Sequence, residues 1–508
     1  MNFSVLEKVV EFDSIAINIK DITSIDPILV DKKILEISKN TINIKPSFAG
    51  DRMVYLVFYE NKIYITLDLQ KLKIKFKIYS DAIGAILNWG IIPYPYTPFE
   101  NVYRLSIGQN CIIEMQSAKL AVSINQHHFF NKNEIMNPNN YDEKEFENIF
   151  FNFFEKNIRN SEETISMTSA GKDSTLLAII CSKLGYNKIN FLTYNDKSTL
   201  DETTFSETIC NKLNLKFNKI NSDIDKNFFE KSDIFFKNAN FPVVDNATIP
   251  YMISTLQINN NISQIIDGMG NDIYFGHILN RKSKIKNFLN SFGKYLPNYE
   301  NKLSRISYIK YLFRPSQLRY MPANYLSSLE LKNILNFEYK SNWISENFNT
   351  NINELEEMYY KSLTRGIHYD FGVAMEKNRF VCSGFSAEPF FPWADETAAR
   401  YIFNLKEKYK FKNYTNKIFL REYLNKKINY DDYKIPKTGF GFESAKFILT
   451  NWKKIFEEII QCKYLNKQKT ENFLKKNNRF LKDDSRYGTG IIGLYIVSRW
   501  LNKSKLIN

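Results

Sequence analysis

Small residues and one carboxylate separate a β-branched run from a helix-forming run near residue 170. The apolar run covers residues 164–168, and helix-forming residues continue from residue 175. The six residues between them are Ser169, Ala170, Gly171, Lys172, Asp173 and Ser174. A strand, a small-residue turn and a helix in this order direct backbone N–H groups toward a phosphate. The stretch predicts an anion-binding loop, although serine and aspartate here can also cap a helix without a ligand.

The spacing of this loop excludes the P-loop of nucleoside triphosphatases. That motif is Gly-x-x-x-x-Gly-Lys-Ser/Thr. Here the residue five positions before Gly171 is Ser166, and the residue after Lys172 is Asp173. The pattern that remains is Ser-x-Gly-x-Asp-Ser, which calls for a different kind of phosphate loop.

A second glycine-containing loop follows a second apolar run. Residues 263–266 predict a buried strand, and the chain continues as Asp267-Gly268-Met269-Gly270-Asn271-Asp272. Two glycines allow the backbone to approach a ligand closely. A carboxylate such as that of Asp272 provides the hard oxygen atoms that Mg²⁺ prefers. This loop therefore predicts a partner for the first one.

The elements between the two loops alternate between strand and helix. Residues 190–194 predict a strand and residues 201–213 a helix. This alternation indicates an α/β fold with a parallel sheet, in which ligands bind at the carboxyl ends of the strands. Residues 141–160 carry phenylalanines at helical spacing and predict a helix that faces the core.

Composition limits the classes of protein to consider. The 508 residues suggest two or three domains. The net charge is +14, but lysine is spread along the whole chain without a basic block, so nucleic-acid binding is not expected. The five cysteines lie far apart without a Cys-x-x-Cys pair, which argues against a disulfide framework or a zinc site. The start of the chain lacks a signal-peptide pattern and residues 490–501 are too short for a membrane span, so we expect a cytoplasmic protein with a core helix there.

Residues 1–134 look β-rich. Residues 53–59 and 62–67 are β-branched and aromatic around the turn-like Glu60-Asn61, which predicts a hairpin, and residues 81–89 predict a short helix. His127 and His128 have no carboxylate or cysteine at ligand spacing, so a structural role is favoured over a metal site. The polar, turn-prone stretch 131–140 predicts a domain boundary.

Both loops resemble those of the asparagine synthetase family. The first resembles that family's pyrophosphate loop, Ser-Gly-Gly-x-Asp-Ser, and the second its Ser-Gly-Glu-Gly-x-Asp-Glu segment. The resemblance implies a PP-loop synthetase domain, of the adenine nucleotide α-hydrolase-like type, over residues 141–508, with ATP and Mg²⁺ as cofactors. It implies that Thr193 lies near the adenine and that Asp173 and Asp272 bind Mg²⁺. The other implied nucleotide-binding residues are Ser169, Gly171, Lys172, Asp173, Ser174, Asp267 and Gly268.

The resemblance returns after residue 359. Glu376 and Arg379 resemble an acid-x-x-Arg pair of the family, which implies that Glu376 serves the attacking amine. Residues 416–422 resemble the family's Lys-x-x-Leu-Arg segment, and residues 435–440 resemble the loop that carries its catalytic lysine. Lys437, together with Lys417, is therefore expected to stabilise the charged transition state. Glu388 and Asp395 match another family segment, and ordinary ion pairing explains them equally well.

The sequence departs from the family at several positions, and three of them bear on the chemistry. Family members that use glutamine carry cysteine at residue 2, where this chain has Asn2, so we expect residues 1–134 to be a degenerate glutaminase of the Ntn type without activity. The residue between the second-loop glycines is Met269, whose thioether cannot relay a proton. The acid that follows Asp272 in the family is replaced by Ile273.

The resemblance implies an enzyme that adenylates a carboxylate with ATP, releases pyrophosphate, and lets an amine or ammonia attack to form an amide. Asparagine synthesis from ammonia is the alternative within the family, and a non-catalytic ATP-binding homologue is the alternative outside enzymes. Residues 278–365 carry no motif and are expected to form an irregular helical insertion that shapes the acceptor pocket. The carboxylate, the amine and the oligomeric state are not predicted.

Overall fold

The computed structural model describes residues 8–11, 23–24, 34–38, 41–46, 49–60, 62–105, 107–116, 119–126, 138–195, 202–258, 261–276, 285, 326–347, 361–362, 364–413, 415–430, 442–478, 481 and 485–508. Asn2, His127, His128, Lys437 and most of the predicted insertion 278–365 lie outside these residues. The predictions made for them stay predictions.

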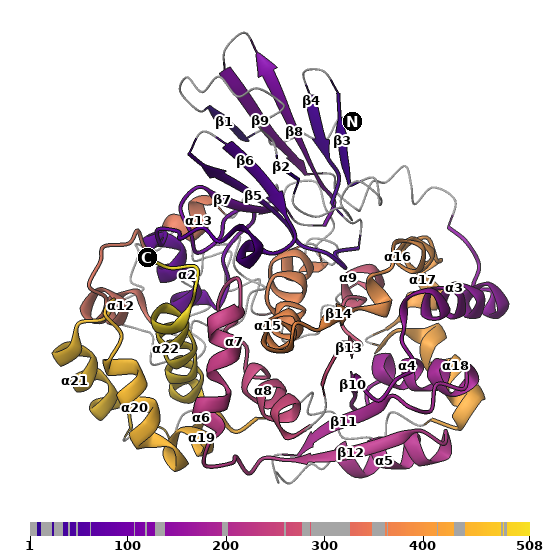
Figure 1. Ribbon diagram of the computed structural model, residues 1–508. Coiled ribbons are helices and arrows are strands. Elements are labelled where there is room, and N and C mark those ends of the chain that lie inside the picture. The colour runs from indigo at the N-terminus through magenta and orange to yellow at the C-terminus, as the bar shows by residue number, and fades with distance from the viewer. Residues whose placement is uncertain are drawn as a thin grey trace.

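A five-stranded parallel sheet forms the centre of the larger part of the molecule, as the alternation of elements predicts (Figure 1). Its order is β12-β11-β10-β13-β14. The strands are β10 (Thr164–Met167), β11 (Asn190–Asn195), β12 (Lys216–Asn221), β13 (Gln264–Asp267) and β14 (Glu388–Phe390). The two central strands, β10 and β13, are short, and all four residues of each are buried, as expected for strands covered on both faces. The edge strand β12 is mostly polar, and only Ile220 of its six residues is buried.

Helices cover both faces of this sheet (Figure 1). On one side lie α3 (Glu143–Asn157), α4 (Lys172–Lys183), α5 (Glu202–Lys212) and α18 (Ile418–Ile428). On the other lie α7 (Asp233–Asn238), α8 (Thr248–Gln257) and α15 (Glu376–Phe385). The predicted core-facing helix is confirmed, because α3 buries Phe146, Phe150 and Phe154 at helical spacing.

Two further sheets from the first 126 residues pack face to face. One has the order β1-β9-β8-β4-β3 and the other β2-β6-β5-β7. Their strands are β1 (Lys8–Glu11), β2 (Thr23–Ser24), β3 (Leu35–Ile37), β4 (Thr41–Ile44), β5 (Val54–Tyr59), β6 (Lys62–Thr66), β7 (Val102–Leu105), β8 (Gln109–Gln116) and β9 (Lys119–Gln126). The predicted hairpin is confirmed by the antiparallel pair β5 and β6.

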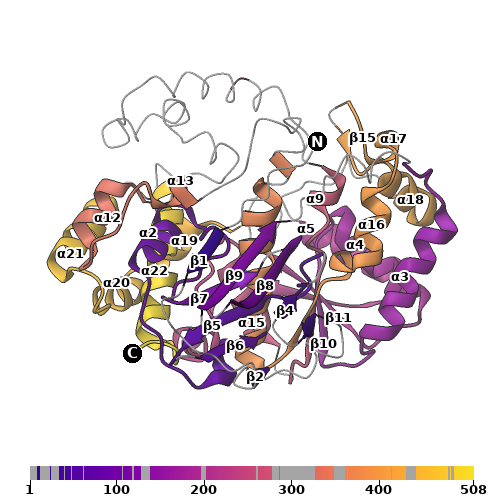
Figure 2. The same cartoon turned by 90° about the horizontal axis from the view of Figure 1, so that it is seen from above.

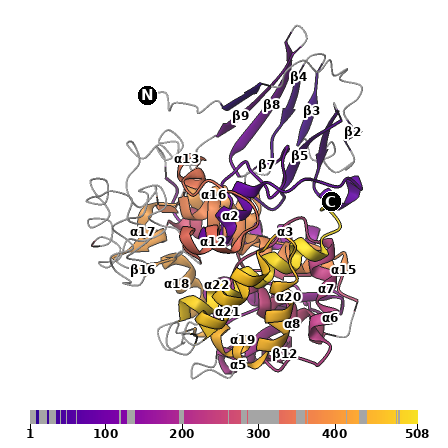
Figure 3. The same ribbon diagram turned by 90° about the vertical axis from the view of Figure 1, so that its left-hand side faces the viewer.

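The second of these sheets has a different apolar core on each face. Val54 and Leu56 of β5 belong to a small core shared with the first sheet, whereas Tyr55 and Val57 belong to the main core of the molecule. This alternation follows from the two-residue period of a strand. The predicted short helix, α2 (Ser80–Trp89), also packs into the main core, and Figure 3 shows it between the two stacked sheets and the C-terminal helices.

Helices from residues 328–347 and 444–503 form a separate group beside the sheet, on the side opposite α3, α4 and α18 (Figure 2). The group contains α12 (Ser328–Ile334), α20 (Trp452–Ile460), α21 (Lys467–Asn478) and α22 (Ser485–Lys503), with α13 (Trp343–Asn347) and α19 (Ser444–Thr450) nearby. α22 confirms the predicted core helix at 490–501, which is buried throughout. Within the part of the chain that the structure describes, no helix is long and apolar enough to cross a membrane.

The remaining elements are short. They are η2 (Leu69–Leu72), α6 (Phe228–Lys231), α9 (Asp272–Phe275), the π-helix η4 (Gly366–Ala374), η5 (Pro392–Ala394), α16 (Glu396–Phe403), α17 (Glu407–Lys410), β15 (Phe411–Lys412) and β16 (Thr415–Asn416). α9 begins at Asp272, and α18 begins directly after Lys417.

Candidate functional site

The two predicted loops begin side by side at the point where the sheet changes its direction of winding. β10 has β11, the next strand along the chain, on one side and β13 on the other. The strand order therefore reverses its direction at β10. Met167 and Asp267, the last residues of β10 and β13, are directly opposite each other in the parallel register. Ligands of open α/β sheets bind in the crevice outside the carboxyl ends of strands at such a switch point. The topology therefore places both loops where a ligand is expected.

Serine side chains fold the first loop tightly onto itself. The Ser174 hydroxyl donates to the Ser169 carbonyl at 2.7 Å, and the Ser169 N–H donates to the Ser174 Oγ at 3.2 Å. The Gly171 N–H donates to the Ser169 Oγ at 3.1 Å. Gly171 is the N-cap of α4, and as a glycine it has no side chain that could cap the helix. The amino end of α4 keeps the geometry of an anion site, and the anion-binding role of its first-turn amides stays a prediction.

The second loop approaches the first through backbone rather than side chains. A Cβ atom built on Gly268 would lie 3.2 Å from the backbone nitrogen of Ser174, which is closer than side chains ordinarily pack. Gly270 has a φ of +108°, in the region that favours glycine. Both glycines are thus needed for the second loop to lie against the amino end of α4.

Four polar side chains from three segments meet at these loops, and we call them the Lys417 cluster: Lys417, Asp173, Asp272 and Asn271. The Lys417 ammonium lies 2.8 and 2.7 Å from the two carboxylate oxygens of Asp173 and 2.7 Å from Oδ1 of Asp272. The Asn271 amide nitrogen donates to Asp173 Oδ1 at 2.6 Å, and its carbonyl oxygen accepts from Lys417 at 2.9 Å. The two carboxylates predicted to bind Mg²⁺ are therefore held around one cation.

The Lys417 side chain is buried, with 3% of it exposed. Burial alone would lower the pKa of Lys417, but the carboxylates of Asp173 and Asp272 outweigh it and raise the pKa above its ordinary value. The backbone of Lys417 is left-handed, with φ 56° and ψ 43°, at the N-cap position of α18. Few residues other than glycine adopt this conformation, and here it marks the point where the chain enters α18 from β16.

The residues of the Lys417 cluster fit a divalent cation bound together with a phosphate group. Asp173 and Asp272 converge on one point, and their side chains are 23% and 43% exposed. Carboxylate oxygens suit Mg²⁺, which usually binds through one or two carboxylates, substrate phosphates and water. Among the described residues, no group of three or more histidines, cysteines and acids is arranged to hold a metal alone. Phosphate oxygens and water would complete the coordination.

Asp267 and Thr193, both predicted to contact the nucleotide, are engaged in internal hydrogen bonds. Asp267 is buried, accepts from the Tyr251 hydroxyl at 2.8 Å and from the Met269 N–H at 3.1 Å. Burial raises its pKa, although nearby Lys377 opposes this. The buried Thr193 hydroxyl donates to the Thr168 carbonyl at 3.0 Å. In the structure these contacts shape the two loops, and direct contacts of Asp267 and Thr193 with a nucleotide stay predictions.

Glu376 lies in a buried ion pair with Arg379, one turn along α15. Arg379 also donates to the backbone carbonyls of Gly50 at 2.7 Å and Asp51 at 3.1 Å. The pair therefore ties α15 to the segment that leads into β5. The neighbouring Met375 lies 3.5 Å from the Cβ position of Gly270, so this end of α15 is close to the second loop.

Asp395 and Glu388 have structural partners. The Asp395 carboxylate accepts from the Ala398 N–H at 3.0 Å as the N-cap of α16. The exposed Glu388 lies 3.7 Å from Arg159.

Of the predicted lysines, Lys417 belongs to the cluster, Lys172 is buried in the first turn of α4, and Lys437 lies outside the described residues.

Sequence reasoning did not single out two residues that contact the site. Asn271 joins Asp173 to Lys417, and the Tyr430 hydroxyl donates to the Ala170 carbonyl in the first loop. For Asn271 a signal existed, because an amide stands between Gly270 and the predicted metal ligand Asp272. For Tyr430 none did, since its contact spans 260 residues.

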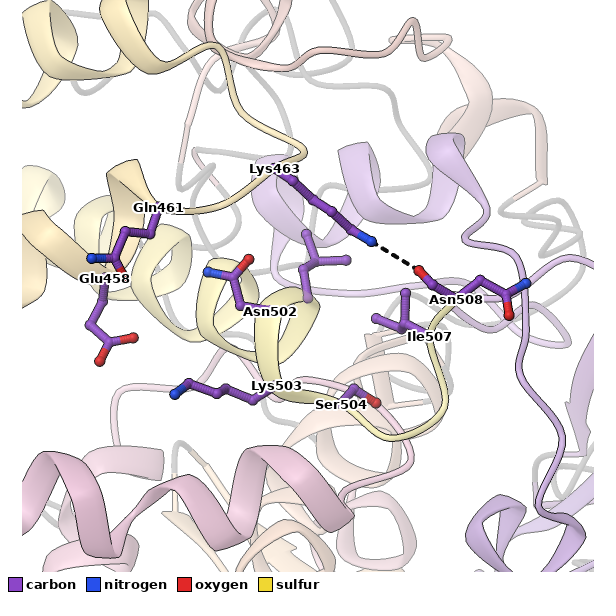
Figure 4. Close-up of a pocket in the computed structure, with 9 residues that line it drawn as sticks. Glu458, Gln461, Lys463, Asn502, Lys503, Ser504, Ile507 and Asn508 are labelled. Carbon is purple, nitrogen blue, oxygen red and sulfur yellow. Dashed lines mark hydrogen bonds between the residues drawn. The ribbon is translucent and has the colours of Figure 1, made fainter.

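A pocket with a volume of about 380 Å³ lies elsewhere, at the end of α22 (Figure 4). Its lining comes from α20 and the residues that follow it, from the end of α22, and from the last residues of the chain. The Lys463 ammonium donates to the Asn508 carbonyl at 2.9 Å. None of the residues that line it belongs to either loop or to the Lys417 cluster.

Comparison with known proteins supports the assignment of the loops. A family model described as asparagine synthase matches residues 154–502. This range contains both loops and all four residues of the Lys417 cluster. A search of curated proteins found no significant match.

Proposed function

The chain belongs to the asparagine synthase family, and from this premise we propose that it is an ATP-dependent ligase that forms a carbon–nitrogen bond by way of an acyl-adenylate. A carboxylate oxygen attacks the α-phosphorus of ATP, the bond from that phosphorus to the bridging oxygen breaks, and pyrophosphate leaves. An amine or ammonia then attacks the acyl carbon, the bond to AMP breaks, and the nitrogen loses a proton to give the amide.

The observation that carries the proposal is the convergence of both loops on the Lys417 cluster at the switch point of the sheet. The amino end of α4 and the loop around Gly171 suit the departing pyrophosphate, because backbone N–H groups and the helix dipole favour negative charge. Lys417 provides a buried positive charge, which is worth more there than in water.

Asp173 and Asp272 would hold Mg²⁺, which supplies charge neutralisation to the phosphates when it is bound. In the proposed arrangement Lys437 adds a second lysine to the transition state. In the proposed arrangement Glu376 serves the amine, and its ion pair with Arg379 links it to the contacts that hold α15 against Gly50 and Asp51.

We further propose that the two stacked sheets of the N-terminal part are a degenerate glutaminase-type region that does not hydrolyse glutamine. The side chain of Asn2 is an amide and lacks the nucleophilicity of a thiolate. Ammonia or an amine substrate would then supply the nitrogen. Product formation with glutamine as the sole nitrogen source would contradict this part of the proposal.

The test of the reaction is carboxylate-dependent exchange of labelled pyrophosphate into ATP, measured over a panel of carboxylates. We expect exchange with a subset of the panel, and we expect Asp173→Asn to lower it on the order of a thousandfold. Asp225→Asn is a matched control, because Asp225 is an exposed aspartate whose carboxylate lies 2.6 Å from Lys231. Full exchange in Asp173→Asn, or ATP binding without exchange for any carboxylate, would contradict the proposal, and the second result would favour a non-catalytic ATP-binding homologue.

Asparagine synthesis from ammonia is the alternative within the same chemistry. Exchange that depends on aspartate alone would favour it, and exchange that depends on another carboxylate would exclude it.

A further inference from the structure

The Lys417 ammonium uses the same carboxylate oxygens that a metal ion would use. Its nitrogen lies 2.7–2.8 Å from both oxygens of Asp173 and 2.7 Å from Oδ1 of Asp272. Mg²⁺ would have to approach such oxygens to 2.0–2.1 Å in near-octahedral geometry. An ion that binds both carboxylates must therefore displace the ammonium from at least part of its contacts.

The surroundings of Lys417 oppose that displacement. The side chain is buried, so repulsion between its charge and an incoming cation is only weakly screened. Asn271 strengthens the arrangement at both ends, because it donates to Asp173 and accepts from Lys417. Without another anion nearby, the ammonium has no better partner than the two carboxylates.

A nucleoside triphosphate changes this balance. Its phosphates offer new acceptors for the ammonium and additional oxygens for the metal, directly beside the amino end of α4. The ammonium and the metal then no longer compete for two carboxylates alone, and both cations are neutralised.

We propose that Lys417 is the resident counter-cation of Asp173 and Asp272 and excludes divalent metal from them until a nucleoside triphosphate is bound. The inference rests on the proposed function only in that the site takes a triphosphate. It makes Lys417 a positioning residue before catalysis, in addition to its proposed role in the transition state. Metal and nucleotide would consequently enter the site together.

The experiment is a titration of the nucleotide-free protein with Mn²⁺, followed by the electron paramagnetic resonance signal of the free ion. We expect weak binding to the wild type, and an affinity that rises on the order of tenfold or more in Lys417→Met. Lys427→Met is the matched control, because Lys427 is in the same helix and also bridges two carboxylates, those of Glu143 and Glu147. It should bind Mn²⁺ as the wild type does.

Equal Mn²⁺ affinities of the wild type and Lys417→Met would overturn the inference. Circular dichroism checks that each variant is folded, and Lys417→Gln repeats the test if the methionine variant is not. If neither folds, the wild type decides, since tight Mn²⁺ binding without nucleotide contradicts the inference and weak binding supports it. The titration contains neither ATP nor carboxylate substrate, so its outcome is separate from that of the exchange assay, which tests the proposed function.

Discussion

Lys417, the N-cap residue of α18, and Lys427, in its last turn, each bridge a pair of carboxylates, and they differ in how well their charges suit the helix. Lys417, at the N-cap, bridges Asp173 and Asp272. Lys427, in the last turn, lies 2.8 Å from Glu143 and 3.0 Å from Glu147. A cation is favourable near the C-terminus of a helix and unfavourable near its N-terminus. Lys427 therefore agrees with the helix dipole, and Lys417 opposes it.

The surroundings of Lys427 explain it as a structural contact. Glu143 and Glu147 lie in the first turns of α3, where acids are favourable, and Lys183 in the last turn of α4 approaches Glu147 to 2.6 Å. We call Lys427, Glu143, Glu147 and Lys183 the Lys427 cluster. Each of these charges is favourable at its own end of a helix, and together they join the ends of α3, α4 and α18.

Lys417 instead combines an unfavourable helix position with a left-handed backbone and a buried charge. Residues that break local rules concentrate at functional sites, where the surrounding structure holds them in place. A lysine that bridges two carboxylates is therefore no sign of a functional site in itself. Two features distinguish the Lys417 cluster. Lys417 has an unfavourable backbone conformation and an unfavourable charge position, and the cluster lies between two loops at the switch point.

The largest expected effect is on pyrophosphate exchange, when one carboxylate of either cluster is neutralised. Asp173→Asn removes the charge that would hold the metal and pair with Lys417, so pyrophosphate exchange should fall on the order of a thousandfold. Glu147→Gln removes the corresponding charge of the Lys427 cluster and should leave exchange within about twofold of the wild type. Equal losses in the two variants would remove the distinction between the clusters.

Asn271→Ala should have an intermediate effect. It removes the amide that holds Asp173 and Lys417 together, while both charges stay. Loss of a hydrogen bond to charged groups is worth about 1.5–3 kcal/mol, so we expect exchange to fall about 10- to 100-fold. Asn425→Ala, in the exposed part of α18, is the control, and unchanged exchange in Asn271→Ala would show that the amide does not position the cluster.

Gly268→Ala tests the contact between the loops. The added methyl would lie 3.2 Å from the backbone nitrogen of Ser174, so the loops must separate by a few tenths of an ångström. We expect the KM for ATP to rise about tenfold, a change of about 1.4 kcal/mol. An unchanged KM would mean that the close approach of the loops is irrelevant to nucleotide binding.

The smallest effect concerns stability in acid and belongs to the Lys427 cluster. Burial would raise the pKa of Glu147, but hydrogen bonds from Lys183, Tyr423 and Lys427 lower it to about 2. A carboxyl with a lowered pKa stabilises the fold above its ordinary pKa, and this stabilisation is lost as the pH falls from about 5 to about 2.

The free energy of unfolding of Glu147→Gln at neutral pH should therefore be about 1–2 kcal/mol below that of the wild type. It should also fall less steeply than that of the wild type as the solution becomes acidic. Thermal unfolding followed by circular dichroism at several pH values measures both. Parallel curves for the two proteins would show that Glu147 does not carry this stabilisation.

The sequence was sufficient for elements whose apolar pattern is regular. The strands at β10, β11 and β13, the hairpin of β5 and β6 and the helices α3 and α22 were predicted because their periodicity and length follow from burial. The two loops were predicted because small residues and carboxylates follow buried strands. Short segments that only complete a sheet, such as β14, carried no such signal.

The sequence was insufficient where a contact joins distant segments. The Lys417 cluster spans residues 173 to 417, and no local pattern fixes that convergence. Asp267 has the same type of side chain as Asp173, yet one is buried against Tyr251 and the other faces the cluster. The tie from Arg379 to Gly50 links residues 329 apart. The division into two domains, 1–134 and 141–508, stays a prediction. In the structure, α2 and one face of β5 share the main core with the five-stranded parallel sheet.

Pyrophosphate exchange in Lys417→Met and Lys427→Met, with a carboxylate that supports exchange by the wild type, tests whether Lys417 takes part in the reaction while Lys427 does not. Both substitutions remove a lysine that bridges two carboxylates from the same helix. We expect exchange to fall by about two to three orders of magnitude in Lys417→Met and to be retained in Lys427→Met. Full exchange in Lys417→Met, or an equal loss in both, would contradict this expectation.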